Sequence, residues 1–527
     1  MDTSGKVVGN IKWTGQLSGQ NTLEVGEILG LTLFGIFFVM KGFGLYDGQK
    51  IFLLGMLFAI CLLFLKCIGD TFSLPEIVLW SGWVILAIIN YSISDDNGVL
   101  LCLCMIMASK RCRLERICKV GILAFGGTGL INLFLSMLSV HEGTVVLHNK
   151  LGGEILRYAF GQPHPNVLHT TYVILCCFIL FVMRDNQHWI KLNLILLLGS
   201  FGFFFYTISY TGILMSICLF GAAIVYLLHK RNRWFDWVAA YGILIGVIFF
   251  SVGMPLIANL QGAFFQSFMQ SIRHRFILLN IYFDEFHITL FGQKISGILG
   301  YQLDTSWAVL LLSGGVLLFC SFVLVYCMGL YILLKQDRLL ELYIVLILLL
   351  GGMMDPFLFN TSMKNIGLIF MASAIYDYFS NRSGQVICFN RLLNQWMAKE
   401  IHLFEPRVNP KHYSWKQLGV MLGIAIIVSI GMMQVVKMPT KYCVSSMDAL
   451  GERDFVVEHV MLTSELLQDE DVEIFGNCKQ NTEVYLVDSD RIRSIEYYRT
   501  FFGVGVVVFF IQMVFYNLFS FGLERTV

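Results

Sequence analysis

The sequence is poor in charged residues. Only 14% of its 527 residues are charged, whereas 57% are hydrophobic. Soluble domains carry roughly 25% charged and about 45–50% apolar residues. This shortage of charge excludes an ordinary soluble domain and points to a protein with a large apolar surface.

Several other features are missing as well. The formal net charge is +1 and no basic face is evident, which argues against nucleic-acid binding. The 14 cysteines include no CxxC pair at zinc spacing, and most lie inside hydrophobic runs, where cysteine commonly serves as a small apolar side chain. Residues 1–22 contain no hydrophobic stretch, so we expect no cleavable signal peptide and predict that the first span directs insertion.

What the chain does contain is a series of long runs rich in Leu, Ile, Phe, Val and Gly. A run of about 20 apolar residues crosses a hydrocarbon core of about 30 Å. Only helices and closed barrels satisfy their backbone there, and these runs lack the alternation of barrel strands. The sequence therefore predicts an all-α, polytopic transmembrane bundle. We place about fourteen spans, at 24–40, 51–66, 74–93, 98–109, 120–139, 167–183, 192–208, 211–228, 235–255, 306–334, 340–354, 365–380, 417–436 and 500–520.

The positions of lysine and arginine predict the orientation of the spans, because cytoplasmic loops carry an excess of these residues. With the N-terminus in the cytoplasm, every strongly basic short loop lies on the same side, and the C-terminus is cytoplasmic too. The basic residues that face the cytoplasm are then Lys6, Lys12, Lys110, Arg111, Arg113, Arg116, Lys119, Arg184, Lys191, Lys230, Arg231, Arg233, Lys335, Arg338, Arg382, Arg391, Lys399, Arg407, Lys411 and Lys416.

This topology divides the chain into four parts. We expect a cytoplasmic N-terminal segment, a transmembrane core with two extended outer loops, a basic cytoplasmic linker, and two further spans around an outer segment of soluble composition. Their bounds are 1–23, 24–380 (outer loops 140–166 and 256–304), 381–416, and 417–527 (outer domain 437–498).

The outer segment 437–498 reads as a small extracellular domain. Cys443 and Cys478 are the only cysteines predicted outside, and a disulfide between them is compatible with that compartment. Two free thiols are the alternative. No internal repeat is visible along the chain, which argues mildly against a transporter, since many transporters are built from paired halves.

The first candidate functional segment runs from Arg157 to Asn166 and is followed by His169. Two prolines flank His164 and fix an extended or turned backbone at the entry to a span. Asn166 can cap the helix that follows. The alternative is a rigid turn with His164 on the surface, although an outer arginine at position 157 is harder to explain in that way.

The second candidate segment begins with Arg273 and Arg275, continues through His287, and ends near Asp304. Residues 263–283 are apolar but broken by polar residues, which predicts an amphipathic helix at the outer interface. The two arginines could simply anchor lipid headgroups, because long basic side chains snorkel to the interface. Outer arginines run against the positive-inside bias, however, and a pair of them favours a function.

Together, the two segments predict one outer face with arginines, histidines and carboxylates. Arginine suits phosphate oxygens through its fork of donors, so Arg157, Arg273 and Arg275 are the candidate pyrophosphate ligands. A sugar hydroxyl needs a base, which His164 or Asp304 could supply. No DxD-like pair stands out on this face, so neither a metal nor another cofactor is expected. Asn166, His287 and Asp355 are assigned supporting roles.

Several short motifs occur in order along this core. Arg157 precedes Phe160-Gly161 and His164-Pro165-Asn166, and the arginines at 273 and 275 precede Ile288-Thr289-Leu290-Phe291-Gly292. Leu303-Asp304-Thr305-Ser306 follows, and then Asp355 with Asn360 and Asn365. In these motifs the chain resembles the O-antigen and capsule polymerase family, particularly its Gram-positive exopolysaccharide members, within the broader O-antigen ligase and polymerase superfamily. The resemblance covers roughly residues 24–380.

The resemblance implies a metal-independent glycosyl transfer in the bacterial cytoplasmic membrane. A growing chain would pass from one undecaprenyl pyrophosphate carrier onto a new lipid-linked repeat unit, with arginines on the pyrophosphate. Pathway partners would be a flippase and a chain-length regulator. Two features depart from the family: Ser209-Tyr210 stands where a Ser-Arg pair is expected, and Asp355 stands where Glu is expected.

Three other functions remain open. A ligase of the same superfamily would share the arginine chemistry. A flippase or transporter of lipid-linked sugars would need charged residues deep inside the spans, and these are scarce here. A structural or sensory membrane protein would tolerate alanine at Arg157, Arg273 and Arg275.

Overall fold

The structure is a computed structural model that is mostly helical. The residues it describes are 22–137, 145–150, 153–186, 188–228, 233–257, 270–297, 303–380, 386–402, 415–435, 441–444, 454–463, 472–475 and 482–523.

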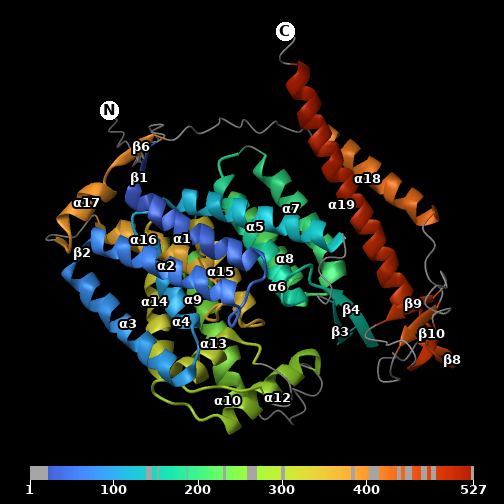
Figure 1. The fold of residues 1–527 in the computed structure, drawn as a ribbon, viewed down its shortest axis with the longest axis horizontal. Coiled ribbons are helices and arrows are strands. Elements are labelled where there is room, and N and C mark those ends of the chain that lie inside the picture. Colours follow the sequence, from blue (N-terminus) through green and yellow to red (C-terminus); the bar gives the residue numbers. More distant parts are fainter. Residues whose placement is uncertain are drawn as a thin grey trace, which may run out of the picture.

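The helices follow the apolar runs of the sequence (Figure 1). Two of them are interrupted by a π-helical turn, η1 (Phe249–Gly253) between α9 and α10 and η2 (Leu310–Gly314) between α13 and α14. The helices are α1 (Val25–Gly42), α2 (Lys50–Gly69), α3 (Leu74–Ser94), α4 (Gly98–Ala108), α5 (Leu114–Met137), α6 (Pro165–Val182), α7 (Trp189–Thr207), α8 (Tyr210–Leu228), α9 (Arg233–Ile248), α10 (Met254–Ile257), α12 (Gln270–Glu285), α13 (Ser306–Val309), α14 (Gly315–Lys335), α15 (Leu339–Gly352), α16 (Ile366–Ser380), α17 (Arg391–Met397), α18 (Trp415–Val435) and α19 (Asp490–Leu523).

Each predicted span coincides with a helix. Among the described residues, ten helices are long and apolar enough to cross a membrane: α1, α2, α3, α5, α6, α7, α8, the α9–α10 helix, the α13–α14 helix and α18. Helices α4, α15 and α16 are apolar but shorter. The amphipathic helix predicted at 263–283 is present as α12 from Gln270 onward, and 258–269 lie outside the described residues. The chain is therefore a helical, multi-pass membrane protein.

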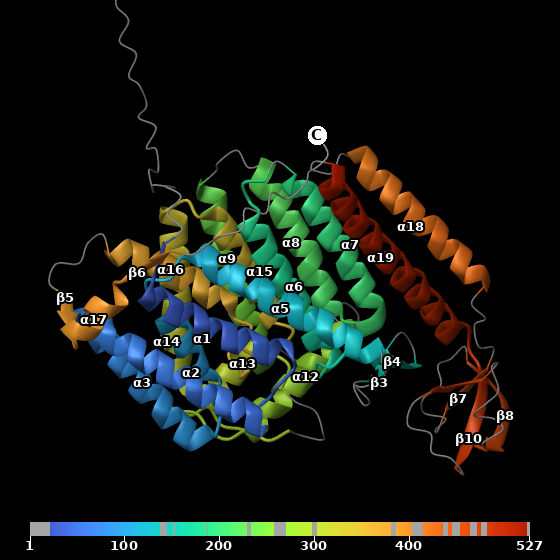
Figure 2. The same cartoon turned by 45° about the horizontal axis from the view of Figure 1, so that its top comes forward.

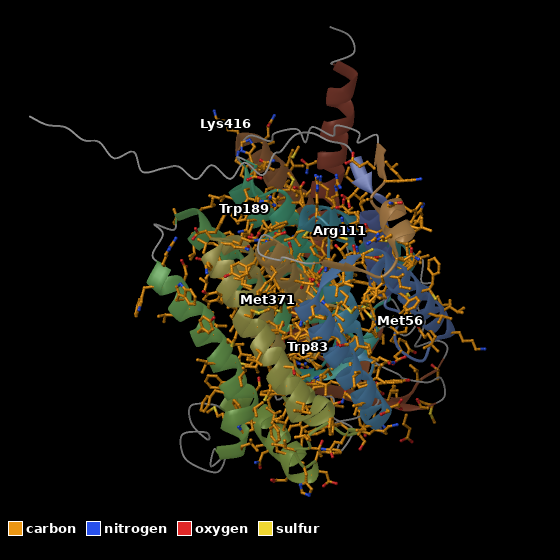
Figure 3. All side chains as sticks on the ribbon, turned by 90° about the vertical axis from the view of Figure 1, so that its left-hand side faces the viewer. Met56, Trp83, Arg111, Trp189, Met371 and Lys416 are labelled. Atoms are coloured by element: carbon orange, nitrogen blue, oxygen red, sulfur yellow. The ribbon has the colours of Figure 1, made fainter. Side chains whose placement is uncertain are left out.

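Apolar side chains cover both the inward-facing and the outward-facing sides of the helices. Helices α1–α9 and α13–α16 contribute side chains to a common core, in which Phe38 packs against Phe125 and Phe178 with ring centroids 5.2 and 5.6 Å apart. Figure 3 shows the side chains that fill this core, Met371 among them. Other large apolar side chains, such as Leu54 and Phe64 of α2, are exposed on the outside of the bundle. Such faces are stable only against an apolar surrounding such as lipid.

The structure has four small sheets, two of which, β1–β6 and β2–β5, connect segments that are far apart in the sequence. β1 (Thr22–Glu24) pairs with β6 (Glu400–His402), β2 (Thr71–Ser73) with β5 (Val386–Cys388), and β3 (Val145–Lys150) with β4 (Gly153–Tyr158), all antiparallel. The fourth sheet has the order β8-β10-β7-β9, in which only β7 and β9 are parallel. Its strands are β7 (Lys441–Val444), β8 (Phe455–Met461), β9 (Val472–Phe475) and β10 (Glu483–Asp488).

The two ends of helix α1 differ in what surrounds them. At its start, β1, β6 and α17 gather, and buried Glu27 pairs with Arg116 of α5. Residues 386–402, which lie within the predicted basic linker 381–416, therefore pack onto the start of the bundle through β5, α17 and β6. At the other end of α1, Gln162 donates a hydrogen bond to the Gly42 carbonyl, which places the turn after β4 there.

The C-terminal region forms a unit that we call the C-terminal module: α18, the sheet β7–β10, and α19. Figures 1 and 2 show α18 and α19 side by side along one flank of the bundle, with the sheet at their end. Helix α19 packs on α7, where Phe205 stacks on Phe502 with centroids 4.6 Å apart. The sheet contacts β4 through Leu156, which packs with Tyr442 and Val487.

Candidate functional site

Arg157 lies in strand β4, opposite Val146 of β3. Its side chain is only 1% exposed. Nε donates to the Thr207 carbonyl at 2.6 Å, and Nη2 donates to Asn166 Oδ1 at 2.5 Å. Burial lowers the pKa of Arg157 to about 10, opposed by Tyr210 and by Asp355. The guanidinium is thus still a cation at neutral pH, and it is held between the ends of α6 and α7.

The turn after β4 brings Arg157 to the start of α6. Phe160 and Gly161 both adopt positive φ, at 42° and 78°, which reverses the chain. His164 is the N-cap of α6, and its Nδ1 accepts a hydrogen bond from the Asn166 backbone N–H at 3.1 Å. The prediction that Asn166 caps this helix is therefore wrong: His164 is the cap, and the Asn166 side chain accepts from Arg157 instead. This geometry favours the turn role of His164 over a role as base.

Arg275 comes from α12, far from Arg157 in sequence. Its Nη1 donates to the Met354 carbonyl at 2.8 Å and lies 3.9 Å from Asp304 Oδ2. Ser306 Oγ donates to the Asp355 carbonyl at 2.7 Å. These contacts hold α12 and the start of α13 against the connection between α15 and α16.

Asp355 lies in that connection, and four charged side chains influence its pKa. Burial is the main cause that raises the pKa of Asp355 to about 6; Lys364, Arg275 and Arg157 oppose this rise, and Asp304 adds to it. A carboxyl titrating near neutral pH can accept or release a proton under working conditions.

Lys364 completes the group and was not predicted from the sequence. Its side chain is 2% exposed, and Nζ donates to the Val167 carbonyl of α6 at 2.6 Å. Burial lowers the pKa of Lys364 to about 7, while Asp355 raises it. The signal in the sequence is that Lys364 is the only lysine or arginine between 339 and 381. An isolated cation between two apolar runs is a candidate functional residue in a membrane protein.

We call these five residues the charged cluster: Arg157, Arg275, Asp304, Asp355 and Lys364. They come from β4, α12, the segment before α13, and the α15–α16 connection. Three cations and two carboxylates can bind an anion and also exchange a proton. The structure thus gathers four residues that the sequence had singled out in separate segments.

A buried polar network inside the bundle lies next to the charged cluster. His169 of α6 is fully buried, with Nδ1 3.2 Å from Thr207 Oγ1 and Nε2 2.8 Å from Ser200 Oγ. Ser200 in turn donates to Ser216 of α8 at 2.6 Å. Because the Thr207 carbonyl accepts from Arg157, this network fixes the residue that holds the arginine. The sequence had named His169 but assigned it no partner.

Other predicted residues lie elsewhere or outside the description. Arg273 belongs to α12, but its side chain is outside the described residues. His287 follows α12 and is exposed. Cys443 is buried in β7, and Cys478 lies outside the described residues, so their disulfide stays a prediction. In the described ranges, no three His, Cys, Asp or Glu side chains could hold a metal ion together.

Comparison with known proteins adds no identification: no family model, no curated protein and no solved structure matches the chain.

Proposed function

We propose that the protein is a bacterial polysaccharide polymerase, which joins undecaprenyl-pyrophosphate-linked oligosaccharide repeat units at the outer face of the cytoplasmic membrane. The observation that carries the proposal is the convergence of Arg157 and Arg275 with Asp304 and Asp355, from segments about 200 residues apart in the sequence, at one end of the bundle. These are the motif residues of the resemblance. In this proposal, a flippase supplies the repeat units and a chain-length regulator acts with the enzyme.

The proposed topology has fourteen spans, with both termini in the cytoplasm and the C-terminal sheet outside. Its support is the separation of charges along α1. The basic residues around Arg111 and Arg116 pair with Asp70 and Glu27 near the start of α1. The charged cluster lies toward the other end, beside the turn that contacts Gly42. The positive-inside rule then assigns the charged cluster to the outer face.

The chemistry is a glycosyl transfer. An acceptor sugar hydroxyl attacks the anomeric carbon of the lipid-linked chain, a new glycosidic C–O bond forms, and the bond from that carbon to the pyrophosphate oxygen breaks. The pyrophosphate leaves with the electron pair, and arginine charge stabilises it. Arg157 and Arg275 are assigned this role because both present guanidinium groups at the cluster.

The proton of the acceptor hydroxyl passes to a carboxylate. We assign it to Asp355, since a pKa of about 6 suits a base that works near neutral pH. Asp304 lies beside Arg275 and is half exposed, so it is assigned to orient that arginine. His164 is committed to capping α6.

The experiment is a lipid extract from cells lacking the protein, with the lipid-linked sugars sized by mass. The proposal predicts single repeat units on the outer leaflet and no long polymer. Long polymer stranded on its carrier would indicate a ligase, and single units trapped on the inner leaflet would indicate a flippase. An unchanged sugar profile would refute all three. Complementation with Arg157→Ala or Arg275→Ala is expected to leave the single units in place, although each variant inserts into the membrane.

A further inference from the structure

Arg499 is a buried arginine of α19 that the proposed chemistry does not use. Its side chain is 3% exposed and pairs with Glu496. Nε donates to the Phe205 carbonyl at 2.9 Å, and Nη2 donates to the Leu156 carbonyl. Since Leu156 directly precedes Arg157, Arg499 holds the peptide unit that contains the Arg157 nitrogen. Phe205 lies two residues before Thr207, the acceptor of the Arg157 side chain.

A second set of contacts, independent of hydrogen bonding, holds the same strand. Leu156 packs on Tyr442, Val487 and Ile492 of the C-terminal module, and Ile155 packs with Ile208 and Ile495. Both residues preceding Arg157 in β4 are thus buried against this module. Figure 1 shows β4 lying between the helical bundle and the C-terminal sheet.

Arg157 and Arg499 each connect strand β4 to the end of α7 through hydrogen bonds. Arg157 connects β4 to the end of α7 through Thr207, and Arg499 connects β4 to the end of α7 through Leu156 and Phe205. The guanidinium of Arg499 also lies over the Tyr158 ring, 4.9 Å from its centroid. β4 is one strand of a two-stranded hairpin, and isolated two-stranded hairpins are only marginally stable. The hairpin therefore depends on these connections for its position.

We propose that Arg499 is a positioning residue for Arg157, and that the C-terminal module serves to hold the arginine strand in its pyrophosphate-binding place. This inference rests on the proposed function. It gives the C-terminal module a role in the reaction that the resemblance, which ends near residue 380, does not supply. It also provides a route by which a partner bound to the outer sheet would alter catalysis, because the sheet touches β4 directly.

The test measures the affinity of the purified protein for undecaprenyl pyrophosphate, which is the product carrier. The variants are Arg157→Ala, Arg499→Ala, Arg499→Lys and the double variant Arg157→Ala with Arg499→Ala. Arg493→Ala is the matched control, since Arg493 is an arginine of the same helix that pairs with Asp488 and Asp490. Affinity reports on the folded fraction alone, so a role limited to stability would leave the Kd unchanged.

We expect Arg499→Ala to weaken binding by about 100-fold, as small misplacements of a binding group do. Arg499→Lys keeps the charge and one donor, so we expect a loss of about tenfold. Arg493→Ala should stay within about twofold of the parent, in the range of ordinary surface changes. In the Arg157→Ala background, Arg499→Ala should add nothing, because a residue that acts through Arg157 has no effect once Arg157 is gone.

The outcomes separate the two proposals. If Arg157→Ala weakens binding but Arg499→Ala and Arg499→Lys do not, the positioning role fails while the proposed function stands. The positioning role would also be overturned if the losses of affinity in Arg157→Ala and Arg499→Ala multiplied in the double variant, because the two residues would then act independently. If Arg157→Ala leaves the Kd unchanged, the pyrophosphate role of the cluster fails, whatever Arg499 does. If Arg499→Ala does not fold, the Kd of Arg499→Lys is compared in the parent and in the Arg157→Ala background, and the same criteria apply.

Discussion

Removing the Lys364 charge should move the acid limb of the activity profile to higher pH. Asp355 has a pKa of about 6, and Lys364 is the largest of the influences that lower it. An opposite charge nearby shifts a carboxyl pKa by about one unit or more. In Lys364→Gln this stabilisation of the carboxylate is lost, so the pKa of Asp355 should rise to about 7. The base must be ionised to act, and therefore the rate falls where the carboxyl is protonated.

The size of the effect depends on pH in a way that identifies its cause. At pH 6 the ionised share of Asp355 falls from about one half to about one tenth, which lowers the rate about fivefold. At pH 8 the carboxyl is ionised in both proteins to about nine tenths or more, and the rates should nearly agree. A general loss of folded protein would instead lower the rate by the same factor at every pH.

The assay is kcat/KM against pH, measured in proteoliposomes with lipid-linked repeat units extracted from cells lacking the protein. Lys294→Gln is the control, because Lys294 is exposed and pairs with Asp95 rather than with the cluster. Its acid limb should match that of the parent. An acid limb that stays in place in Lys364→Gln, or that moves equally in Lys294→Gln, would refute the assignment of Asp355 as the base.

Three further predictions concern a glycine, an arginine and a pair of cysteines. Gly212→Ala should lower stability by about 1–3 kcal/mol, because a Cβ there would overlap the His169 ring, whereas Gly221→Ala in the same helix meets open space and should not destabilise; thermal unfolding of the two purified variants checks this. Arg157→Lys keeps the charge but cannot donate in two fixed directions, so polymer yield in complemented cells should stay closer to Arg157→Ala than to the parent, and full recovery would mean that charge alone suffices. If Cys443 and Cys478 are joined, reduction before alkylation should add two more alkyl groups to the protein mass than alkylation alone, and equal masses would show two free thiols.

The sequence was sufficient to locate the helices. Continuous apolar runs such as 51–66 and 340–354 need no partner to be recognised, and helices α2 and α15 lie where they were expected. The short strands were not predicted, because β1 and β6 have three residues each and exist only by pairing across nearly 380 residues. A three-residue segment carries too little pattern to identify a strand.

The candidate site was predicted in part for the same reason. Arg157, Arg275, Asp304 and Asp355 stand out one by one as charged residues close to apolar runs, but only the fold brings them together. Lys364 is visible as an isolated cation, whereas its approach to Val167 of α6 depends on how the helices pack. The Asn166 cap was misassigned because the helix begins two residues earlier than expected: His164 is the N-cap and accepts from the Asn166 backbone N–H, while the Asn166 side-chain oxygen accepts from Arg157. Arg499 could not have been connected with Arg157, since they are separated by more than 300 residues and meet only through carbonyl groups.

The most direct test of the central claim is reconstitution of the purified protein in proteoliposomes that contain only lipid-linked repeat units. We expect a ladder of products that differ by one repeat unit, with one undecaprenyl pyrophosphate released for every linkage, and no ladder from Arg157→Ala. Repeat units that remain single in the presence of the folded parent protein would contradict this claim.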